Sequence, residues 1–239
     1  MIAGGVISNM EGTASALRYS VRKNSWDFDV PSMSTGRACL TSVAIGGRMM
    51  IFGGYYGNQL ATCEAFDPCT NSWSRLPPMS TPRSSACAIA WQGRAFVFGG
   101  LNQGGIASSA ECFDPTLNRW SAIAPMTTAR YRAAAVAIPG RGPLVIGGYG
   151  AGILQSAELF HPLKNRWTTM KWKLPKPLYD FAAHCIHGVL HIIGGYTSNR
   201  AVAECWSMDL SAEFPVWSAL SPLPCATAGF ASVSLTTTF

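Results

Sequence analysis

A glycine doublet that follows two apolar residues recurs along the chain at nearly constant intervals. The copies read IAGG, IFGG, VFGG, VIGG and IIGG, and successive copies lie 49, 46, 48 and 47 residues apart. A tryptophan follows each doublet; these are Trp26, Trp73, Trp120, Trp167 and Trp217. A period near 50 residues with the same punctuation in every copy indicates stacked supersecondary units.

The segment ECFDPTLNRW, residues 111–120, places two carboxylates, an aromatic ring and a tryptophan close together. Taken alone, Glu111 and Asp114 could be a pair of catalytic carboxylates. EAFDPCTNSW at 64–73 and ELFHPLKNRW at 158–167 repeat the pattern at intervals of 47 residues. A catalytic group is rarely needed three times at equal spacing. We therefore interpret the segment as a strand, a turn of Asp-Pro and Asn, and a second strand that begins near the tryptophan.

Each repeat divides into four short strands. In the third copy, SSACAIAW and AFVFGG flank the tight turn QGR, and SSAECFDP and RWSAIAPM follow. The segments are bounded by turn-forming residues, and none shows an extended helical periodicity. The sequence predicts an all-β fold in a single domain, residues 1–239. Its repeats lie at about 34–79, 80–126, 127–174 and 175–224, with one more assembled from 1–33 and 225–239.

The glycine doublet, the glutamate with its aromatic neighbour, the spaced tryptophan and the arginine that opens the next unit together resemble the kelch repeat. The resemblance covers essentially the whole chain and implies a β-propeller with one four-stranded antiparallel blade per repeat. We expect five blades, one of them closed by strands from both termini; a fragment of a larger ring is the alternative. Departures are local. Leu17 replaces the glutamate in the first copy, His161 replaces the turn aspartate in the fourth, and the fifth copy spaces Trp217 irregularly.

The composition limits the class of partner. Only 13% of residues are charged, and the formal net charge of +6 gives a mild preference for acidic partners. No dense basic run predicts nucleic-acid binding, and no apolar run predicts a membrane helix. The eight cysteines show neither a disulfide framework nor a metal-binding spacing. The start of the chain lacks the parts of a signal peptide. We expect a cytoplasmic setting, a monomeric isolated domain and no cofactor.

The residues that do not repeat cluster in the loop after each glycine doublet and in the link that precedes each first strand. Up-and-down blades place these segments on one rim. Their aromatic, amide and arginine side chains are typical of a surface that binds a protein or peptide. The predicted partner-binding rim comprises Tyr55, Tyr56, Asn58, Gln59, Arg83, Asn102, Gln103, Arg130, Arg132, Tyr149, Tyr179, Asp180, Tyr196, Asn199 and Arg200.

Two interpretations of the repeat arginines stay open. Arg37, Arg83 and Arg130 could face a ligand, or they could pair with the repeat glutamates inside the blade. Kelch domains that recruit degrons carry an arginine two places past this position, and here only Arg132 stands at that place. The sequence therefore gives little support to an acidic-peptide site of that kind. Arg132 is the residue that we assign to surface recognition.

Enzymatic alternatives find little support in the sequence. His184, His187 and His191 form the only histidine cluster, and strand alternation places the first two on opposite faces. A shared metal ion is therefore not expected, and we predict no metal site. No phosphate-binding loop is present, because GGLNQGG follows a strand but opens no helix. We predict no catalytic residues.

The resemblance implies a non-catalytic protein-interaction module. Kelch domains often serve as substrate-recognition domains of BTB-kelch adaptors for cullin-RING ubiquitin ligases, and that role would depend on what precedes Met1. An actin-associated scaffold is the alternative within binding proteins; its docking face would be the opposite, more basic rim. A kelch-type enzyme acting on a sugar or another small molecule is the alternative from a different class.

Overall fold

The computed structural model describes residues 1–5 and 12–230. The described residues form short antiparallel strands and one short 3-10 helix, Pro162–Lys164. No helix among them is long and apolar enough to cross a membrane. The chain divides into two compact units, Met1–Ile123 and Ala124–Phe239, called here the first and the second unit.

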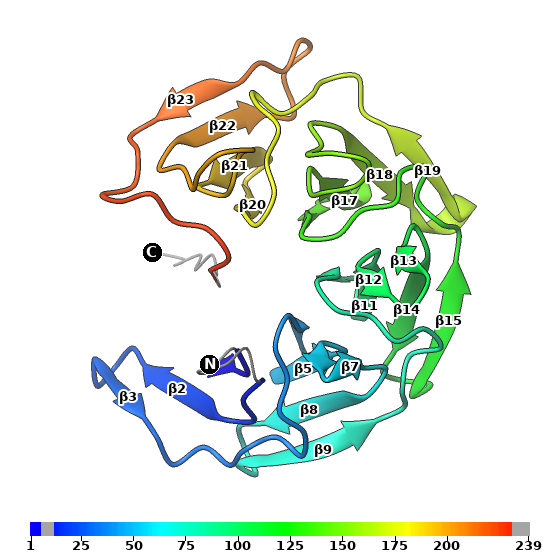
Figure 1. Ribbon diagram of the computed structural model, residues 1–239, viewed down its shortest axis with the longest axis vertical. Helices are drawn as coiled ribbons and strands as arrows, with labels where there is room; N and C mark the ends of the chain where they lie inside the picture. The colour runs from blue at the N-terminus through cyan, green and yellow to red at the C-terminus, as the bar shows by residue number, and fades with distance from the viewer. Residues whose placement is uncertain (6–11, 231–239) are drawn as a thin grey trace. The chain divides into compact units, whose positions relative to one another are not determined.

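The described part of the first unit holds three antiparallel blade sheets, whose strands follow one another in chain order (Figure 1). The first sheet consists of β1 (Ile2–Ala3), β2 (Ala16–Ser20) and β3 (Ser25–Asp27). The second consists of β4 (Thr41–Ile45), β5 (Arg48–Phe52), β8 (Cys63–Asp67) and β9 (Ser72–Leu76). The third consists of β10 (Cys87–Trp91), β11 (Arg94–Phe98), β14 (Ala110–Asp114) and β15 (Arg119–Ile123).

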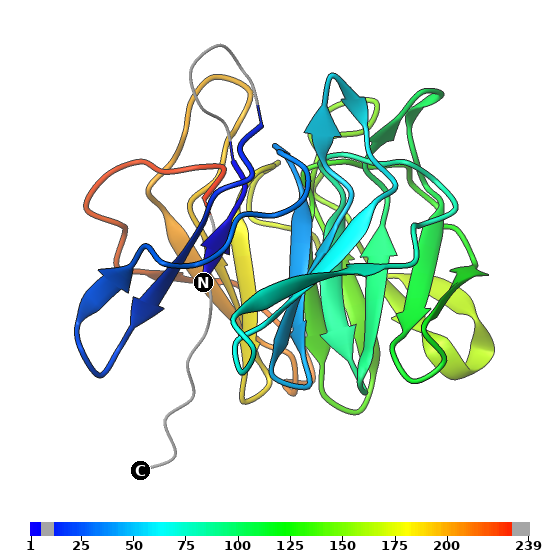
Figure 2. The same cartoon turned by 90° about the horizontal axis from the view of Figure 1, so that it is seen from below.

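Two small ribbons leave the blade sheets of the first unit directly after a glycine doublet. One pairs β6 (Tyr55–Tyr56) with β7 (Asn58–Gln59), and the other pairs β12 (Leu101–Asn102) with β13 (Gly105–Ile106). In Figure 2 the β6–β7 ribbon extends beyond the upper end of its blade sheet. These ribbons are therefore loops of the predicted rim, not additional blade strands.

The described part of the second unit holds two four-stranded antiparallel sheets, again in chain order. One consists of β16 (Ala134–Ile138), β17 (Gly142–Ile146), β18 (Ala157–His161) and β19 (Arg166–Thr169). The other consists of β20 (Ala182–Ile186), β21 (Val189–Ile193), β22 (Cys205–Asp209) and β23 (Ser218–Leu220). These sheets confirm the all-β prediction, and they confirm the four-strand division in the four repeats whose sheets have four described strands.

The hairpin between the first two strands of a blade is set by paired residues with positive φ. Gln92 and Gly93 have φ of 47° and 73°, and His187 and Gly188 have φ of 49° and 82°. Positive φ at both central residues is the signature of a type I′ turn, whose twist matches that of the flanking strands. The glycine-containing dipeptides thus fix the register of the β10–β11 and β20–β21 hairpins.

Within each unit, the repeat tryptophan bonds to the segment that leaves the preceding blade. Trp120 lies opposite Phe113 in the sheet, with ring centroids 5.1 Å apart, and its indole N–H donates to the carbonyl of Pro77 at 2.9 Å. Trp217 makes the same bond to Lys173, at 2.7 Å, despite its irregular spacing. The tryptophan therefore supplies both apolar packing and a fixed hydrogen bond between successive blades.

The turn chemistry of the repeat is also as predicted. The carboxylate of Asp114 accepts the backbone N–H of Thr116 at 2.9 Å, and Asn118 takes the left-handed conformation with φ of 48°. In the fourth repeat His161 makes no such capping bond, and the turn becomes the short 3-10 helix. Closure of one blade by both termini is a prediction that depends on residues 231–239, which lie outside the described residues.

Candidate functional site

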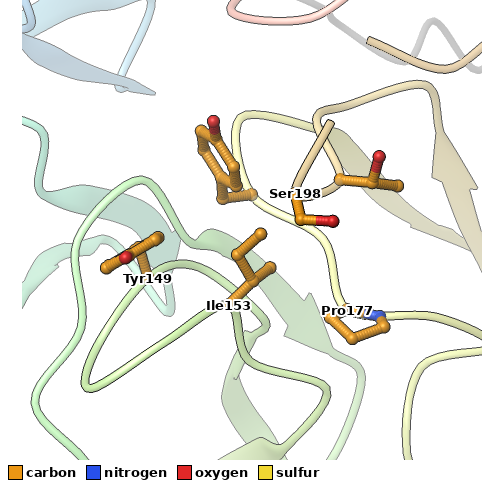
Figure 3. Close-up of a pocket in the computed structure, with 6 residues that line it drawn as sticks. Tyr149, Ile153, Pro177 and Ser198 are labelled. Atoms are coloured by element: carbon orange, nitrogen blue, oxygen red, sulfur yellow. The ribbon is translucent and has the colours of Figure 1, made fainter. Parts of the chain in front are cut away.

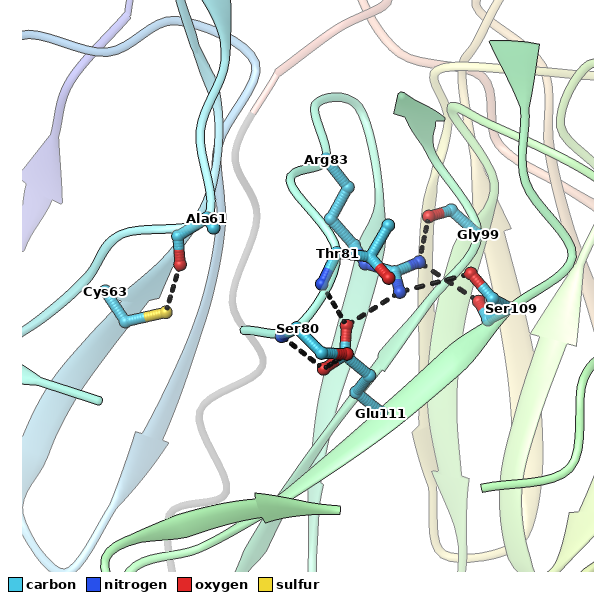
Figure 4. A network of polar contacts seen from close by, with 8 residues as sticks. All are labelled: Ala61, Cys63, Ser80, Thr81, Arg83, Gly99, Ser109 and Glu111. Carbon is cyan, nitrogen blue, oxygen red and sulfur yellow. Dashed lines mark hydrogen bonds and ion pairs between the residues drawn. The ribbon is translucent and has the colours of Figure 1, made fainter. Parts of the chain in front are cut away.

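The repeat arginines form a buried polar frame behind the rim. Arg83 is 1% exposed, and its guanidinium donates to the carbonyls of Gly99 at 2.7 Å and Ser109 at 3.1 Å. It also forms an ion pair with Glu111 at 2.9 Å, as Figure 4 shows. The carbonyl of Gly99 belongs to the glycine doublet, so the arginine ties the start of the rim loop to the blade.

The same arrangement recurs twice more. Arg37 pairs with Glu64 and Arg130 pairs with Glu158, each at 2.7 Å, and both arginines are at most 1% exposed. Assigning Arg83 and Arg130 to the exposed rim was therefore wrong, because both side chains turn into the blade and cap carbonyl groups there. The alternative, pairing with the repeat glutamates, is confirmed for all three arginines.

The glutamates gain further donors from the preceding link. Glu111 accepts the backbone N–H of Ser80 at 2.8 Å and the backbone N–H of Thr81 at 3.2 Å. Burial works to raise the pKa of Glu111, but the hydrogen bonds from Ser80 and Arg83 outweigh it and hold the pKa below its ordinary value. Thr127 and Arg130 hold the pKa of Glu158 below its ordinary value in the same way. These carboxylates are structural anions, unsuited to accept a proton near neutral pH.

The fifth repeat lacks this frame. Leu178 stands at the arginine position and is fully buried within the apolar core of the second unit. Glu204, the corresponding glutamate, is instead partly exposed and pairs with Lys176 at 2.7 Å. The Lys176 ammonium also lies 5.2 Å from the ring centroid of Trp206. An aliphatic side chain has thus replaced the buried cation, and its counter-ion has moved to the surface.

The predicted rim residues lie in loops that are well fixed by backbone bonds. Tyr131 and Tyr149 exchange N–H···O=C bonds of 3.0 and 2.9 Å, and Tyr179 and Tyr196 exchange bonds of 3.1 and 2.8 Å. Each pair joins the link before a blade to the loop after its glycine doublet. The loops are therefore pre-organised, and their paired N–H and C=O groups are not available to a ligand.

The other predicted rim residues are divided between the two units. Tyr55, Tyr56, Asn58 and Gln59 lie in the β6–β7 ribbon of the first unit, where both tyrosines are exposed. Asn102 and Gln103 lie in and beside β12 of the same unit. The second unit holds Arg132, Tyr149, Tyr179, Asp180, Tyr196, Asn199 and Arg200.

Arg132 and Asp180 form an ion pair at the edge of the second unit's rim. Both residues have positive φ, 53° and 52°, and the N–H of Asp180 donates to the carbonyl of Arg132 at 3.0 Å. Their side chains meet at 2.9 Å, with 41% of Arg132 and 21% of Asp180 exposed. Burial raises the pKa of Asp180, and Arg132 opposes that shift. Arg132 is thus exposed but already partly neutralised.

Four tyrosines form a continuous row in the second unit. The ring centroids of Tyr131 and Tyr149 are 5.6 Å apart, those of Tyr149 and Tyr179 are 6.0 Å apart, and those of Tyr179 and Tyr196 are 5.5 Å apart. The Arg132 guanidinium lies 5.8 Å from the ring of Tyr131 at one end. This set of four residues is called the tyrosine row below.

A groove of about 500 Å³ opens beside the two middle members of the tyrosine row, Tyr149 and Tyr179 (Figure 3). It is lined by Tyr149, Ile153, Pro177, Tyr179, Thr197 and Ser198. The sequence pattern did not predict Tyr131, Ile153, Pro177, Thr197 and Ser198. Tyr131 could have been found, because it directly follows Arg130 just as Tyr179 directly follows Leu178. The other four carry no signal in the repeat pattern.

The first unit has no such row in its described residues. The backbone bridges that correspond to the tyrosine pairs join Ala38 to Tyr55 and Ser84 to Leu101. Of these four equivalent positions, only that of Tyr55 is a tyrosine. The two units share a backbone scheme but differ in the chemistry that their rims present.

Comparison with protein families now adds to this geometry. The family model described as the KLHDC2/KLHL20/DRC7 Kelch-repeats domain matches residues 1–195. The chain belongs to the kelch-repeat family. A search of the curated proteins found no match. Among solved structures, the one titled "Structure of YjhT" superimposes with a TM-score of 0.73 at 15% identity. That alignment covers 83% of this chain and 69% of the other, and it shows a common fold: an all-β propeller, here with five blades.

The histidines of this kelch domain do not form a metal centre. His184 lies directly opposite His191 in the β20–β21 pair, and His187 is a residue of the connecting turn. Burial lowers the pKa of His184, and the neighbouring His191 lowers it further. Within residues 1–5 and 12–230, no group of three or more histidine, cysteine or acidic side chains could hold a metal ion.

On the opposite rim of the kelch blades, two exposed arginines form ion pairs with aspartates of their own blade. Arg48 pairs with Asp67 at 2.9 Å, and Arg94 pairs with Asp114 at 3.0 Å. Their side chains are 54% and 58% exposed. The repeat aspartates therefore have two roles, closing the turn and neutralising the arginine of the adjacent hairpin.

Proposed function

We propose that this kelch domain is a non-catalytic interaction module, and that the groove along the tyrosine row holds a short segment of a protein partner. The observation that carries the proposal is the row itself. It presents four aromatic rings on loops fixed by reciprocal backbone bonds. Rigid aromatic side chains bind partners at a low entropic cost and are enriched at binding hot spots.

The ionisable groups near the groove support binding over catalysis. Arg132 pairs with Asp180 and Lys176 pairs with Glu204, so each carboxylate at the border already has a cation partner. The six lining side chains include no acid, no histidine and no cysteine. Tyr149 and Tyr179 are then the only lining side chains that could exchange a proton with a substrate, and none of the other four is a base that could activate them. A kelch-type enzyme is accordingly the weaker proposal.

The biological setting that we propose follows from the family. The domain would act in the cytoplasm as the substrate-recognition part of a BTB-kelch adaptor for a cullin-RING ubiquitin ligase, and as a monomer when isolated. The net charge of +6 favours a partner with acidic residues. An actin-associated scaffold draws less support, because Arg48 and Arg94 on the opposite rim are paired with aspartates of the same blade.

A displayed library of random peptides, selected against the 239-residue chain, tests the proposal. We expect enriched peptides that bind the wild-type domain and lose at least about tenfold in affinity towards Tyr149→Ala. Tyr19→Ala is the matched control, because Tyr19 is a tyrosine of similar exposure, 40% against 36%, on strand β2 of the first unit. Circular dichroism would verify that both variants are folded.

Two results would count against the proposal. One is a selection without enriched peptides under conditions in which the domain is folded. The other is a set of peptides whose binding responds to Tyr19→Ala and is indifferent to Tyr149→Ala. The second result would move the binding surface out of the second unit.

A further inference from the structure

The groove along the tyrosine row has a chemistry that selects among peptide conformations. We infer that it accepts an extended, proline-containing segment in the polyproline II conformation, with an acidic residue beside the prolines. This inference rests on the proposed function and specifies its ligand. Three features carry it: the backbone groups of the groove that are already paired and the hydroxyls that are free, the apolar surfaces of its rings, and the charge at its border.

The backbone of the groove cannot accept an added β-strand. The N–H and C=O groups of Tyr149 are bonded to Tyr131, and those of Tyr196 are bonded to Tyr179. The N–H of Leu154 donates to Gly148, which closes the loop beneath the groove. Strand addition needs an unpaired edge, whereas a polyproline II segment has no internal hydrogen bonds and makes no such demand.

The side chains of the groove instead offer hydroxyl groups. Among the described residues, the hydroxyls of Tyr149, Tyr179 and Ser198 have no hydrogen-bond partner, while that of Thr197 donates to the carbonyl of Arg200 at 3.1 Å. Three free O–H donors match a segment whose proline residues have carbonyl acceptors but no N–H.

Apolar faces complete the fit. Tyr149 and Tyr179 meet edge to face at 89°, with Ile153 and Pro177 also lining the groove. Pyrrolidine rings pack well against such aromatic walls, and the preformed polyproline II helix loses little entropy on binding. Sugar sites also use aromatic platforms, but they add carboxylates or amides that bond paired hydroxyls. The lining residues include neither.

The charge at the border favours an acidic neighbour to the prolines. Arg200 is exposed, lies two residues after Ser198 in the same loop, and forms no ion pair among the described residues. Arg132 gives one guanidinium nitrogen to Asp180 and keeps 41% of its side chain exposed. The nearby acids, Asp180 and Glu204, are both paired with cations. The border therefore has an excess of positive charge that complements a carboxylate.

Fluorescence anisotropy with defined capped peptides tests this inference. The probe is a labelled peptide of about ten residues, rich in proline, with two glutamates preceding the prolines. We expect it to bind the wild-type domain at least about tenfold more tightly than a peptide with every proline replaced by alanine. Tyr149→Ala and Tyr179→Phe should both weaken binding of the proline peptide, the second because it removes one hydroxyl donor and keeps the ring. Tyr19→Phe is the control for the second variant.

A charge swap tests the acidic flank separately. Arg200→Glu should weaken the glutamate-flanked peptide and strengthen a lysine-flanked one, and Arg94→Glu is the matched control because its arginine is exposed in the first unit. Equal binding of the proline and alanine peptides, or equal effects of the two arginine variants, would overturn the inference. If library peptides without proline bind in a Tyr149-dependent way, the inference fails and the proposed function stands. If no peptide binds while an oligosaccharide does, both fail.

Discussion

Replacing Arg83 by leucine tests the buried frame that holds the rim loops. The guanidinium makes four hydrogen bonds: to the carbonyls of Gly99 and Ser109, to the Ser109 hydroxyl at 3.2 Å and to Glu111. Leucine is the residue that the chain itself has at the equivalent position, Leu178, where it is fully buried. The difference is that the glutamate of that repeat, Glu204, has moved to the surface.

In Arg83→Leu, Glu111 would remain buried, 2% exposed, without its counter-ion. Its bonds to Ser80 and Thr81 persist, but removing one partner of a buried ion pair typically destabilises a protein by about 3–5 kcal/mol. We therefore expect the free energy of unfolding to fall by about that amount. Urea unfolding followed by both tryptophan fluorescence and circular dichroism measures the change, and coincident curves would justify a two-state treatment.

The double variant Arg83→Leu/Glu111→Gln separates the charge effect from lost packing. Glutamine keeps an oxygen acceptor for Ser80 and Thr81 but removes the unpaired charge, so the double variant should be less destabilised than the sum of the two single changes. Arg94→Leu is the control, because its exposed pair with Asp114 should leave the urea midpoint nearly unchanged. A loss below about 1 kcal/mol for Arg83→Leu, or strict additivity in the double variant, would refute the reasoning.

Three further predictions concern stability and accessibility. Because the folded protein holds the pKa of Glu111 and Glu158 below the ordinary 4.5, their stabilisation is present above that pH and lost as the pH falls below it. Urea midpoints measured from about pH 6 to pH 3 should therefore decrease, and a flat profile would contradict this. Trp120→Ala should lower the free energy of unfolding by about 3–5 kcal/mol, whereas Trp120→Phe should lose mainly the bond to Pro77 and cost less, as urea unfolding would show. Burial raises the pKa of the Cys63 thiol to about 12, so iodoacetamide near pH 8 should alkylate exposed Cys39 and spare Cys63, which mass spectrometry would detect.

The blades could be predicted because their determinants are local and repeat. The glycine doublets, the Asp-Pro and Asn turns and the tryptophans each act within a few residues, so their spacing alone gives the strand boundaries. Trp217 shows that the geometry tolerates a change in spacing. The longer segment after β22 still delivers its indole N–H to Lys173 at 2.7 Å. The position of the indole ring, and not its spacing in the sequence, determines this contact, and that position depends on the neighbouring blade.

The site was predicted only in part, because the sequence places a residue along the chain but does not give its direction. Arg130 and Arg132 are two residues apart, yet the first is buried against Glu158 and the second is exposed beside Asp180. The backbone also differs at the two positions, because Arg132 has a positive φ of 53° and Arg130 does not. No residue type in the segment ARYR signals that conformation, since glycine and asparagine are absent.

The groove could not be predicted from periodicity, because it is made where the repeats differ. In each of four described repeats, the residue after the arginine position and the residue after the glycine doublet are joined by a backbone bridge. Because main-chain groups form this bridge, the side chains of the two bridged residues can change without weakening the blade. In the second unit all four bridged residues are tyrosines. Arg130 holds the carbonyl of Gly147 at 2.8 Å, two residues before Tyr149, so the frame also fixes the base of the loop. A buried, repeated arginine thereby supports an exposed, unrepeated tyrosine, and for this reason variants of the frame should weaken ligand binding even though no frame residue lines the groove.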